Sequence, residues 1–230
     1  MQGRLSWLAV GATAAMLALT GAASADTVLT LTGPIAGNTL GPQSTSNPCI
    51  IAGTQCQQPA GFGFNNFTSS GAISSYNMYS TTPTANVPDG VQGTPYTVAQ
   101  LTGAVGTTFV VAIDVNTTSA AGETLQLFEV LDTTTNTRLY HYTGPTVIGG
   151  VNNNGNGFGD WSLSLINLAG LPSTDGILFH AVWNNASDGA ESFFLVHAVP
   201  GPLAGAGLPG LMAACGGLLA LARRRRKLVV

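Results

Sequence analysis

An uncharged apolar stretch near the C-terminus constrains this chain more than any other feature of its sequence. Residues 203–222 carry no charged side chain, and at about 1.5 Å rise per residue a helix of this length crosses the hydrocarbon core of a bilayer. The basic tail that follows directly consists of Arg223, Arg224, Arg225, Arg226 and Lys227. Such a cluster stays in the cytoplasm by the positive-inside rule, so the preceding chain is predicted to lie across the membrane.

The N-terminus has the three parts of a secretory signal peptide, predicted to cover residues 1–25. Arg4 supplies a short positive region, and an apolar segment covers residues 5–19. Ala23 and Ala25 form the small-x-small pattern that signal peptidase accepts. Cleavage after Ala25 leaves Asp26 as the mature N-terminus. A buried N-terminal helix is the alternative interpretation.

The segment between these two ends, residues 26–198, is acidic. It holds all ten acidic residues and only one basic residue, Arg138, which gives it a formal charge of −9. A negative surface repels phosphate backbones, so nucleic acid is excluded as a partner.

The C-terminus carries a composite sorting signal. A four-residue motif precedes the apolar span and consists of Val199, Pro200, Gly201 and Pro202. Motif, span (203–222) and basic tail (223–227) together resemble the C-terminal signal of PEP-CTERM proteins, with Gly201 standing where the family motif has Glu. The resemblance implies that a membrane-embedded exosortase processes the chain in a Gram-negative bacterium that makes exopolysaccharide. An ordinary single-pass anchor is the alternative.

The exported segment is patterned as short β-strands. Phe109, Val111, Ile113 and Val115 share one face of a candidate strand. Apolar residues alternate with serines along 161–165, while 177–183 and 192–198 are nearly apolar on both faces, as in central strands. Further strands are predicted at 27–32, 96–101, 124–131 and 137–143. About eight strands separated by Gly, Asn and Pro predict an all-β fold, a β-sandwich or jelly-roll-like domain, with residues 33–70 as a long surface loop.

The chain contains three cysteines. Cys49 and Cys56 lie close together in the predicted loop, and export would place them in an oxidising compartment, which favours a disulfide over two free thiols. Cys215 lies in the apolar span and is interpreted as a small apolar filler.

An asparagine-rich segment offers oxygen donors of the kind that calcium prefers. The candidate ligands are Asn152, Asn154, Asn156 and Asp160. A set of Asx-rich turns is the alternative, and no other cofactor is predicted. No His or Cys spacing matches a transition-metal site.

Catalytic residues are not predicted. A nucleophile elbow is missing from the sequence, and the three histidines, His141, His180 and His197, each lie in a predicted strand, where a hydrogen-bonded core or cleft histidine is expected. A Ser-His-Asp arrangement stays open, because such triads are defined in space.

Three functions follow from these observations. The first is a non-enzymatic surface or matrix protein, anchored in the inner membrane before processing and associated with exopolysaccharide or biofilm afterwards. The second is a carbohydrate-binding module, whose stacking platforms would be Trp161, Trp183, Tyr140 and Tyr142, although aromatic residues in strands more often belong to the core. The third is a secreted hydrolase.

Overall fold

The structure is a computed structural model that describes residues 26–52, 56, 62, 71–77, 90, 92–117, 121–150, 155–186 and 191–198. The predicted signal peptide, the sorting motif 199–202, the apolar span 203–222 and the basic tail 223–227 lie outside the described residues. Among the residues described, no helix has the length and apolar character needed to cross a membrane.

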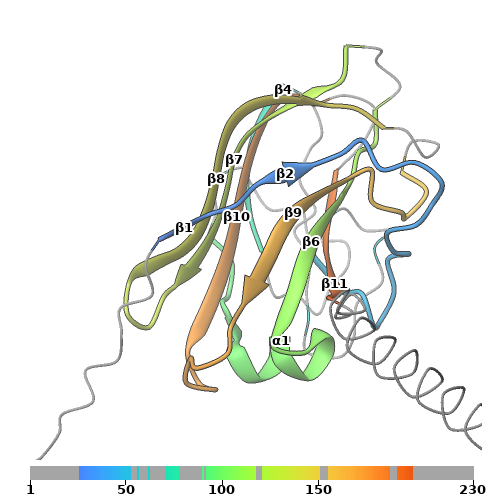
Figure 1. The fold of residues 1–230 in the computed structure, drawn as a ribbon. Helices are drawn as coiled ribbons and strands as arrows, with labels where there is room; N and C mark the ends of the chain where they lie inside the picture. Colours follow the sequence, from blue (N-terminus) through green and yellow to red (C-terminus); the bar gives the residue numbers. More distant parts are fainter. Residues whose placement is uncertain are drawn as a thin grey trace, which may run out of the picture.

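Two packed β-sheets form a β-sandwich, as the strand pattern predicts (Figure 1). In the six-stranded sheet the order is β1 (Thr27–Val28), β8 (Thr137–Ile148), β7 (Glu123–Asp132), β10 (Gly176–Ala186) and β4 (Gly71–Tyr76), and β5 (Tyr96–Thr97) also pairs with β10. In the five-stranded sheet it is β2 (Leu31–Thr32), β9 (Trp161–Asn167), β6 (Thr108–Asp114), β11 (Ser192–His197) and β3 (Cys49–Ile51). The strand pairs are antiparallel, except that β1 runs parallel to β8.

The main core lies between the two sheets and is rich in aromatic rings. Phe128 of β7 packs against Phe193 of the opposite sheet with ring centroids 5.8 Å apart, and against Phe179 at 6.3 Å. Trp183 lies 5.5 Å from Phe193. All four side chains are at most 1% exposed, so apolar burial across the sandwich is the main stabilising contribution.

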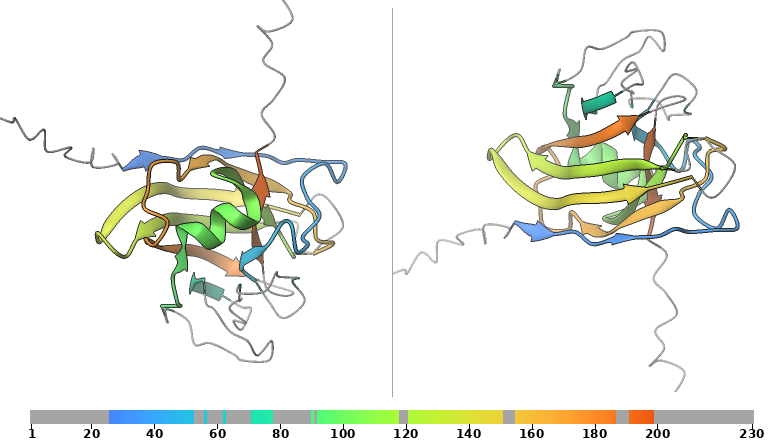
Figure 2. Two further views of the ribbon diagram at one scale, coloured as in Figure 1. Left: turned by 90° about the horizontal axis from the view of Figure 1, so that it is seen from below. Right: turned by 90° about the horizontal axis from the view of Figure 1, so that it is seen from above.

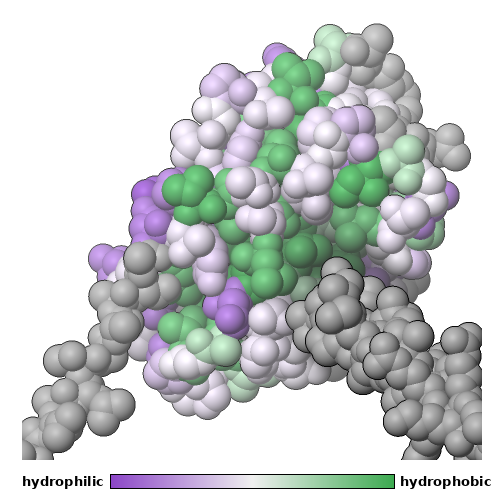
Figure 3. Space-filling view, in the orientation of Figure 1, coloured by the Kyte–Doolittle hydropathy of each residue, from purple (hydrophilic) through white to green (hydrophobic). Residues whose placement is uncertain are grey.

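A smaller apolar cluster covers part of the outer face of the five-stranded sheet. Ala112 and Phe194 project from this face, and Cys49 and Cys56 pack on them together with Leu40. Part of the predicted long loop therefore covers the sheet, and it contributes strand β3 as well. Beyond this cover, apolar residues gather over β9 and β6 (Figure 3), where Leu165 is half-exposed.

The prediction of a strand over residues 96–101 is wrong beyond Thr97. Residues Val98–Val105 form helix α1, which lies across one open end of the sandwich (Figure 2, left). Thr97 and Gln100 form a capping box at its start, and Val98, Leu101 and Val105 share its buried face. Tyr96, Thr97 and Val98 favour a strand, but the spacing of three and four between Val98, Leu101 and Val105 places these three residues on one side of a helix.

Strand β4 was not among the predicted strands. Its sequence, Gly71–Tyr76, offers only one large aliphatic residue, Ile73, which is buried in the core. Ser74 and Tyr76 alternate with it and lie on the outer face of the six-stranded sheet. An edge strand with a polar outer face gives a weak hydrophobic pattern, which explains why the sequence does not reveal it.

Candidate functional site

Strand register brings four polar side chains together on the outer face of the six-stranded sheet. His180 in β10 lies opposite Tyr76 of β4 on one side and opposite Glu129 of β7 on the other. Glu129 in turn lies opposite His141 of β8. Because directly paired residues project to the same face, all of these side chains point away from the core.

A serine, a histidine and a glutamate are hydrogen-bonded in series on this face. Ser74 Oγ lies 3.0 Å from His180 Nε2, and His180 Nδ1 lies 3.2 Å from Glu129 Oε2. The ring of Tyr76 stacks on the imidazole with centroids 4.0 Å apart and planes 5° from parallel. These contacts fix the orientation of the His180 ring.

Glu129 connects this series to a second group of charged side chains. Its Oε1 accepts from Arg138 Nη1 at 2.9 Å. Arg138 also donates to both carboxylate oxygens of Asp26, and His141 Nδ1 lies 2.6 Å from Asp26 Oδ1. We name the whole chain of contacts the polar row; it follows the strand order of the sheet and consists of Ser74, His180, Glu129, Arg138, His141 and Asp26.

The polar row stabilises its own charges. The hydrogen bond from Arg138, with smaller contributions from His141, lowers the pKa of Asp26 below its ordinary value, although some burial opposes this. Burial acts to raise the pKa of Glu129, but Arg138 and His180 outweigh it and the pKa is lowered. Burial, and then the charge of Glu129, raises the pKa of Tyr76. Both carboxyl groups are therefore ionised at neutral pH.

A groove of about 760 Å³ opens beside the polar row. It is lined by Asp26, Gln92, Glu129, Leu131, Asp132, Thr133, Asn136, Thr137 and Arg138. Asp132 shapes its end by accepting from the backbone N–H of Thr134 and Thr135 in the β7–β8 turn. With one aliphatic residue and no aromatic ring among those nine, the groove suits a polar ligand held by hydrogen bonds.

Asp26 belongs to this site as well as to the predicted signal-peptide cleavage site. It is the first described residue, and β1 begins directly after it. Ala23 and Ala25, like the sorting-motif residues Val199, Pro200, Gly201 and Pro202, lie outside the described residues. The structure therefore tests neither cleavage nor sorting.

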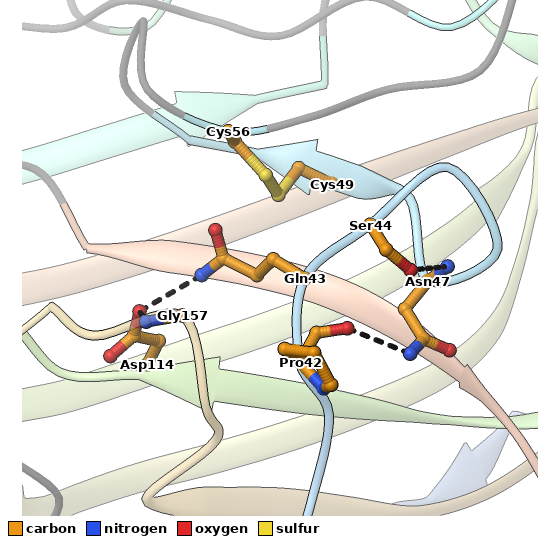
Figure 4. The surroundings of a disulfide bond; sticks show 8 residues. All are labelled: Pro42, Gln43, Ser44, Asn47, Cys49, Cys56, Asp114 and Gly157. Carbon is orange, nitrogen blue, oxygen red and sulfur yellow. Dashed lines mark hydrogen bonds between the residues drawn. A yellow bond between two sulfur atoms is a disulfide. The ribbon is translucent and has the colours of Figure 1, made fainter.

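Cys49 and Cys56 are joined by a disulfide, with Cα atoms 6.3 Å apart (Figure 4). Cys49 is fully buried and Cys56 is 7% exposed. The bond lies against Ala112 and Phe194 in the smaller apolar cluster, so it ties the covering loop to the outer face of the five-stranded sheet.

Two of the four predicted calcium ligands are described, and both use oxygen atoms within the protein. Asp160 Oδ2 accepts from the backbone N–H of Val115 at 2.9 Å, and Asn156 Oδ1 accepts from that of Phe158 at 3.0 Å. The second contact is an Asx turn, the alternative that the sequence analysis left open. Asn152 and Asn154 lie outside the described residues.

Of the four aromatic residues considered as sugar platforms, Trp183 and Tyr142 are buried, and Trp161 and Tyr140 are half-buried against the core. Trp183 is in the core, and the ring of Trp161 is covered by Gly33, where a Cβ atom would lie only 2.4 Å from its Cε3. The Tyr140 and Tyr142 hydroxyls donate to Asn167 O and Thr146 Oγ1, respectively. Burial rules out sugar stacking on Trp183 and Tyr142, as the alternative of core aromatic residues predicts, whereas stacking on Trp161 and Tyr140 stays a prediction.

Comparison with known protein families, with curated proteins and with solved structures found no match to this chain. Sequence reasoning singled out His141 and His180 but missed Ser74, Glu129 and Tyr76 as their neighbours. The strand order decides this proximity: Ser74 and His180 are 106 residues apart in the chain, and strand β4 itself was not predicted.

Proposed function

We propose that this protein is an exported, non-enzymatic component of the cell surface or extracellular matrix. The signal peptide directs it out of the cytoplasm, and the span 203–222 with its basic tail holds it in the inner membrane. An exosortase-like enzyme then processes it at the motif 199–202. The released or retained β-sandwich associates with exopolysaccharide.

The observation that carries the export part of this proposal is the Cys49–Cys56 disulfide. Structural disulfides persist in oxidising compartments outside the cytoplasm and are rare within it. The limits of the folded domain agree with export and sorting too. The first described strand begins at Thr27 and the last ends at His197, so neither predicted processing site lies within a described strand. Both processing steps can therefore take place without unfolding the sandwich.

The outer-face groove supports the association with polysaccharide. Hydroxyl, amide and carboxylate groups line it, and glycans offer matching donors and acceptors. We infer in addition that the sandwich is a jelly roll, because strands β3, β11, β6 and β9 in one sheet and β4, β10, β7 and β8 in the other follow the order of that fold. A fold alone does not define a ligand, so the groove is the feature to test.

Processing is tested with the full chain in its host. Pro200→Ala combined with Pro202→Ala should leave the protein full-length and membrane-bound, whereas the wild type becomes shorter. Pro172→Ala, in a loop of the folded domain, is the matched control and should be processed normally. Identical full-length, membrane-held products from wild type and double variant would rule out processing at this motif.

Glycan association is tested by co-sedimentation of the full chain with the host exopolysaccharide. Thr137→Trp places a large ring in the groove and should reduce the bound fraction at least about threefold, since a blocked site loses most of its contacts. Leu165→Trp, on an exposed position of the other sheet, is the control. Equal binding by both variants would remove the groove from the proposal.

A hydrolase is the second candidate, favoured by the series Ser74–His180–Glu129. In such a reaction the Ser74 hydroxyl would attack an ester carbonyl, His180 Nε2 would take its proton, and Glu129 would hold the imidazole through Nδ1. A fluorophosphonate reagent tests this directly. Labelling at Ser74 that is lost in His180→Gln and retained in Ser75→Ala would establish the candidate, and an unlabelled Ser74 would eliminate it.

A further inference from the structure

Four carboxyl groups gather at the end of the sandwich that lies opposite α1. Asp114 is the last residue of β6, Glu123 is the first of β7, and Asp160 and Glu191 directly precede β9 and β11. Antiparallel pairing of β6 with β9 and β11 brings three of these strand ends together, and Glu123 reaches Glu191 from the facing sheet. The four side chains are 0 to 3% exposed, which is unusual for carboxyl groups.

Among the described residues, no basic side chain neutralises this group. Arg138 is the one Lys or Arg in the part of the chain that the structure describes, and it is engaged in the polar row on the outer face of the six-stranded sheet. Buried carboxylates without a counter-charge cost several kcal/mol each. The charge must therefore be removed by protons or balanced by a bound cation.

In Asp114 and Glu191, one carboxyl oxygen accepts hydrogen bonds and the other does not. Asp114 Oδ2 accepts from Gln43 Nε2 and from the backbone N–H of Gly157, both at 2.9 Å (Figure 4). Glu191 Oε2 accepts from the backbone N–H of Asn116 at 2.6 Å. Asp114 Oδ1 and Glu191 Oε1 are buried and have no hydrogen-bond partner among the described residues. Such oxygens can accept from a proton shared with a neighbouring carboxyl group or coordinate a cation.

The carboxyl groups of Glu191 and Glu123 lie within hydrogen-bonding reach of each other. Burial is the main cause that raises the pKa of Glu191 well above its ordinary value. The contact with Glu123 and its charge raise this pKa further, and Asp114 makes a smaller contribution. Two facing carboxyl groups can share one proton, or they can hold a metal ion between them.

We propose that Glu123 and Glu191 bind a Ca²⁺ ion at this end of the sandwich, with Asp114 as a charged neighbour and not a ligand. Calcium takes six to eight oxygen ligands, including backbone carbonyls, side-chain amides and waters, and it needs no nitrogen or sulfur. In the described part of the chain no group of three or more His, Cys, Asp and Glu side chains is placed to hold a metal ion together. The glutamate pair therefore supplies the charge, and neutral oxygens complete the coordination shell.

This proposal moves the cation from the asparagine-rich loop of the sequence prediction to the strand ends. Asp160 acts as a positioning neighbour, because its Oδ2 is held by Val115 N–H. The site goes beyond the proposed function: it concerns the stability of the exported domain, whatever that domain binds.

Thermal unfolding and calorimetry of the detergent-solubilised full chain at pH 7.5 test the site. Extracellular calcium modules bind with Kd of roughly 10⁻⁴ to 10⁻³ M, so millimolar CaCl₂ after EDTA treatment should raise Tm by about 5 °C or more as saturation is approached. Mg²⁺ should have a smaller effect, because it demands tighter octahedral geometry. Absence of both a Tm shift and a binding heat with CaCl₂ would overturn the proposal and assign a shared proton to the pair.

Matched variants locate the ion. Glu191→Gln should fold, because an amide can donate to Glu123, and should lower calcium affinity at least about tenfold. Glu129→Gln removes the same charge on the outer face and should leave the response unchanged. If Glu191→Gln does not fold, Glu123→Gln serves as the second variant. A wild-type calcium response in both cluster variants would place the ion elsewhere and overturn the proposal.

Discussion

Arg138 donates hydrogen bonds to Asp26 from two nitrogens of its guanidinium group, although the two residues are 112 positions apart in the chain. Nε lies 3.0 Å and Nη2 2.5 Å from Asp26 Oδ2. This contact fastens the start of the described domain to β8, beside the parallel pairing of Thr27 and Val28. It also places the predicted signal-peptide cleavage site directly next to a folded sheet edge.

Arg138→Lys should loosen strand β1 without unfolding the domain. Lysine keeps the charge but lacks the planar fork that binds both carboxylate oxygens. Because the two side chains are 40% and 37% exposed, the global effect should be small, a Tm change of less than about 3 °C. Hydrogen exchange of Leu29 N–H, which donates to His141 O, should become faster. Unchanged exchange at Leu29 would show that the pairing of β1 does not depend on this contact.

Reduction of the Cys49–Cys56 disulfide should destabilise the domain by about 2 kcal/mol, because a short closed loop restricts the unfolded chain only modestly. For a domain of this size, Tm should then fall by roughly 4 to 8 °C. Unfolding curves with and without a reducing agent measure the difference. Cys215→Ser is the control and should respond to the reducing agent as the wild type does. A Tm insensitive to reduction would contradict the prediction.

Phe128→Ala should be among the most destabilising single substitutions, at roughly 3 to 5 kcal/mol. The ring is fully buried and contacts Phe193 of the opposite sheet, so its loss leaves a cavity between the two layers. Leu165→Ala, at a position that is 51% exposed, should change the free energy of unfolding by less than about 0.5 kcal/mol. Denaturant unfolding of both variants provides the comparison, and similar losses would contradict the assignment of the core.

In the presence of EDTA, the free energy of unfolding should decrease as pH rises from 5 to 8. Burial is the main cause that raises the pKa of Asp114 to about 7, and the charge of Asp160 adds to it. Hydrogen bonds from Gly157 and Gln43 act in the opposite direction but are weaker. The folded state then binds more protons than the unfolded state, so this stability is present at low pH and is lost as pH rises through 7. Asp114 alone should contribute roughly 2 to 3 kcal/mol over this interval.

The groups that face Asp114 at this end are Asp160, Glu191 and, through Glu191, Glu123. Asp114→Asn should flatten the pH profile. The polar row acts in the opposite direction: the pKa values of Asp26 and Glu129 are lowered, so its contribution is lost as pH falls below about 4. A stability profile in EDTA that rises from pH 5 to pH 8 would contradict both the sign and the assignment.

The sequence by itself determined the β-rich character of residues 26–198 and most of the strands. Alternation along 161–165 and apolar runs at 177–183 and 192–198 are local patterns, and a strand's period of two is visible within a few residues. Helix α1 was missed because it contains β-branched Val98, Thr102 and Val105 and the poor helix former Gly103. The capping box of Thr97 and Gln100 and the burial of Leu101 outweigh these preferences.

Only the tertiary structure decided which distant side chains meet. Ser74, His180 and Glu129 became neighbours through the order of β4, β10 and β7, and Glu123 and Glu191 met because their strands begin at the same end of the sandwich. Local sequence contains no information about strand order, since that order minimises the free energy of the whole packed core rather than of any one segment. Both the polar row and the buried carboxyl pair are therefore products of the fold.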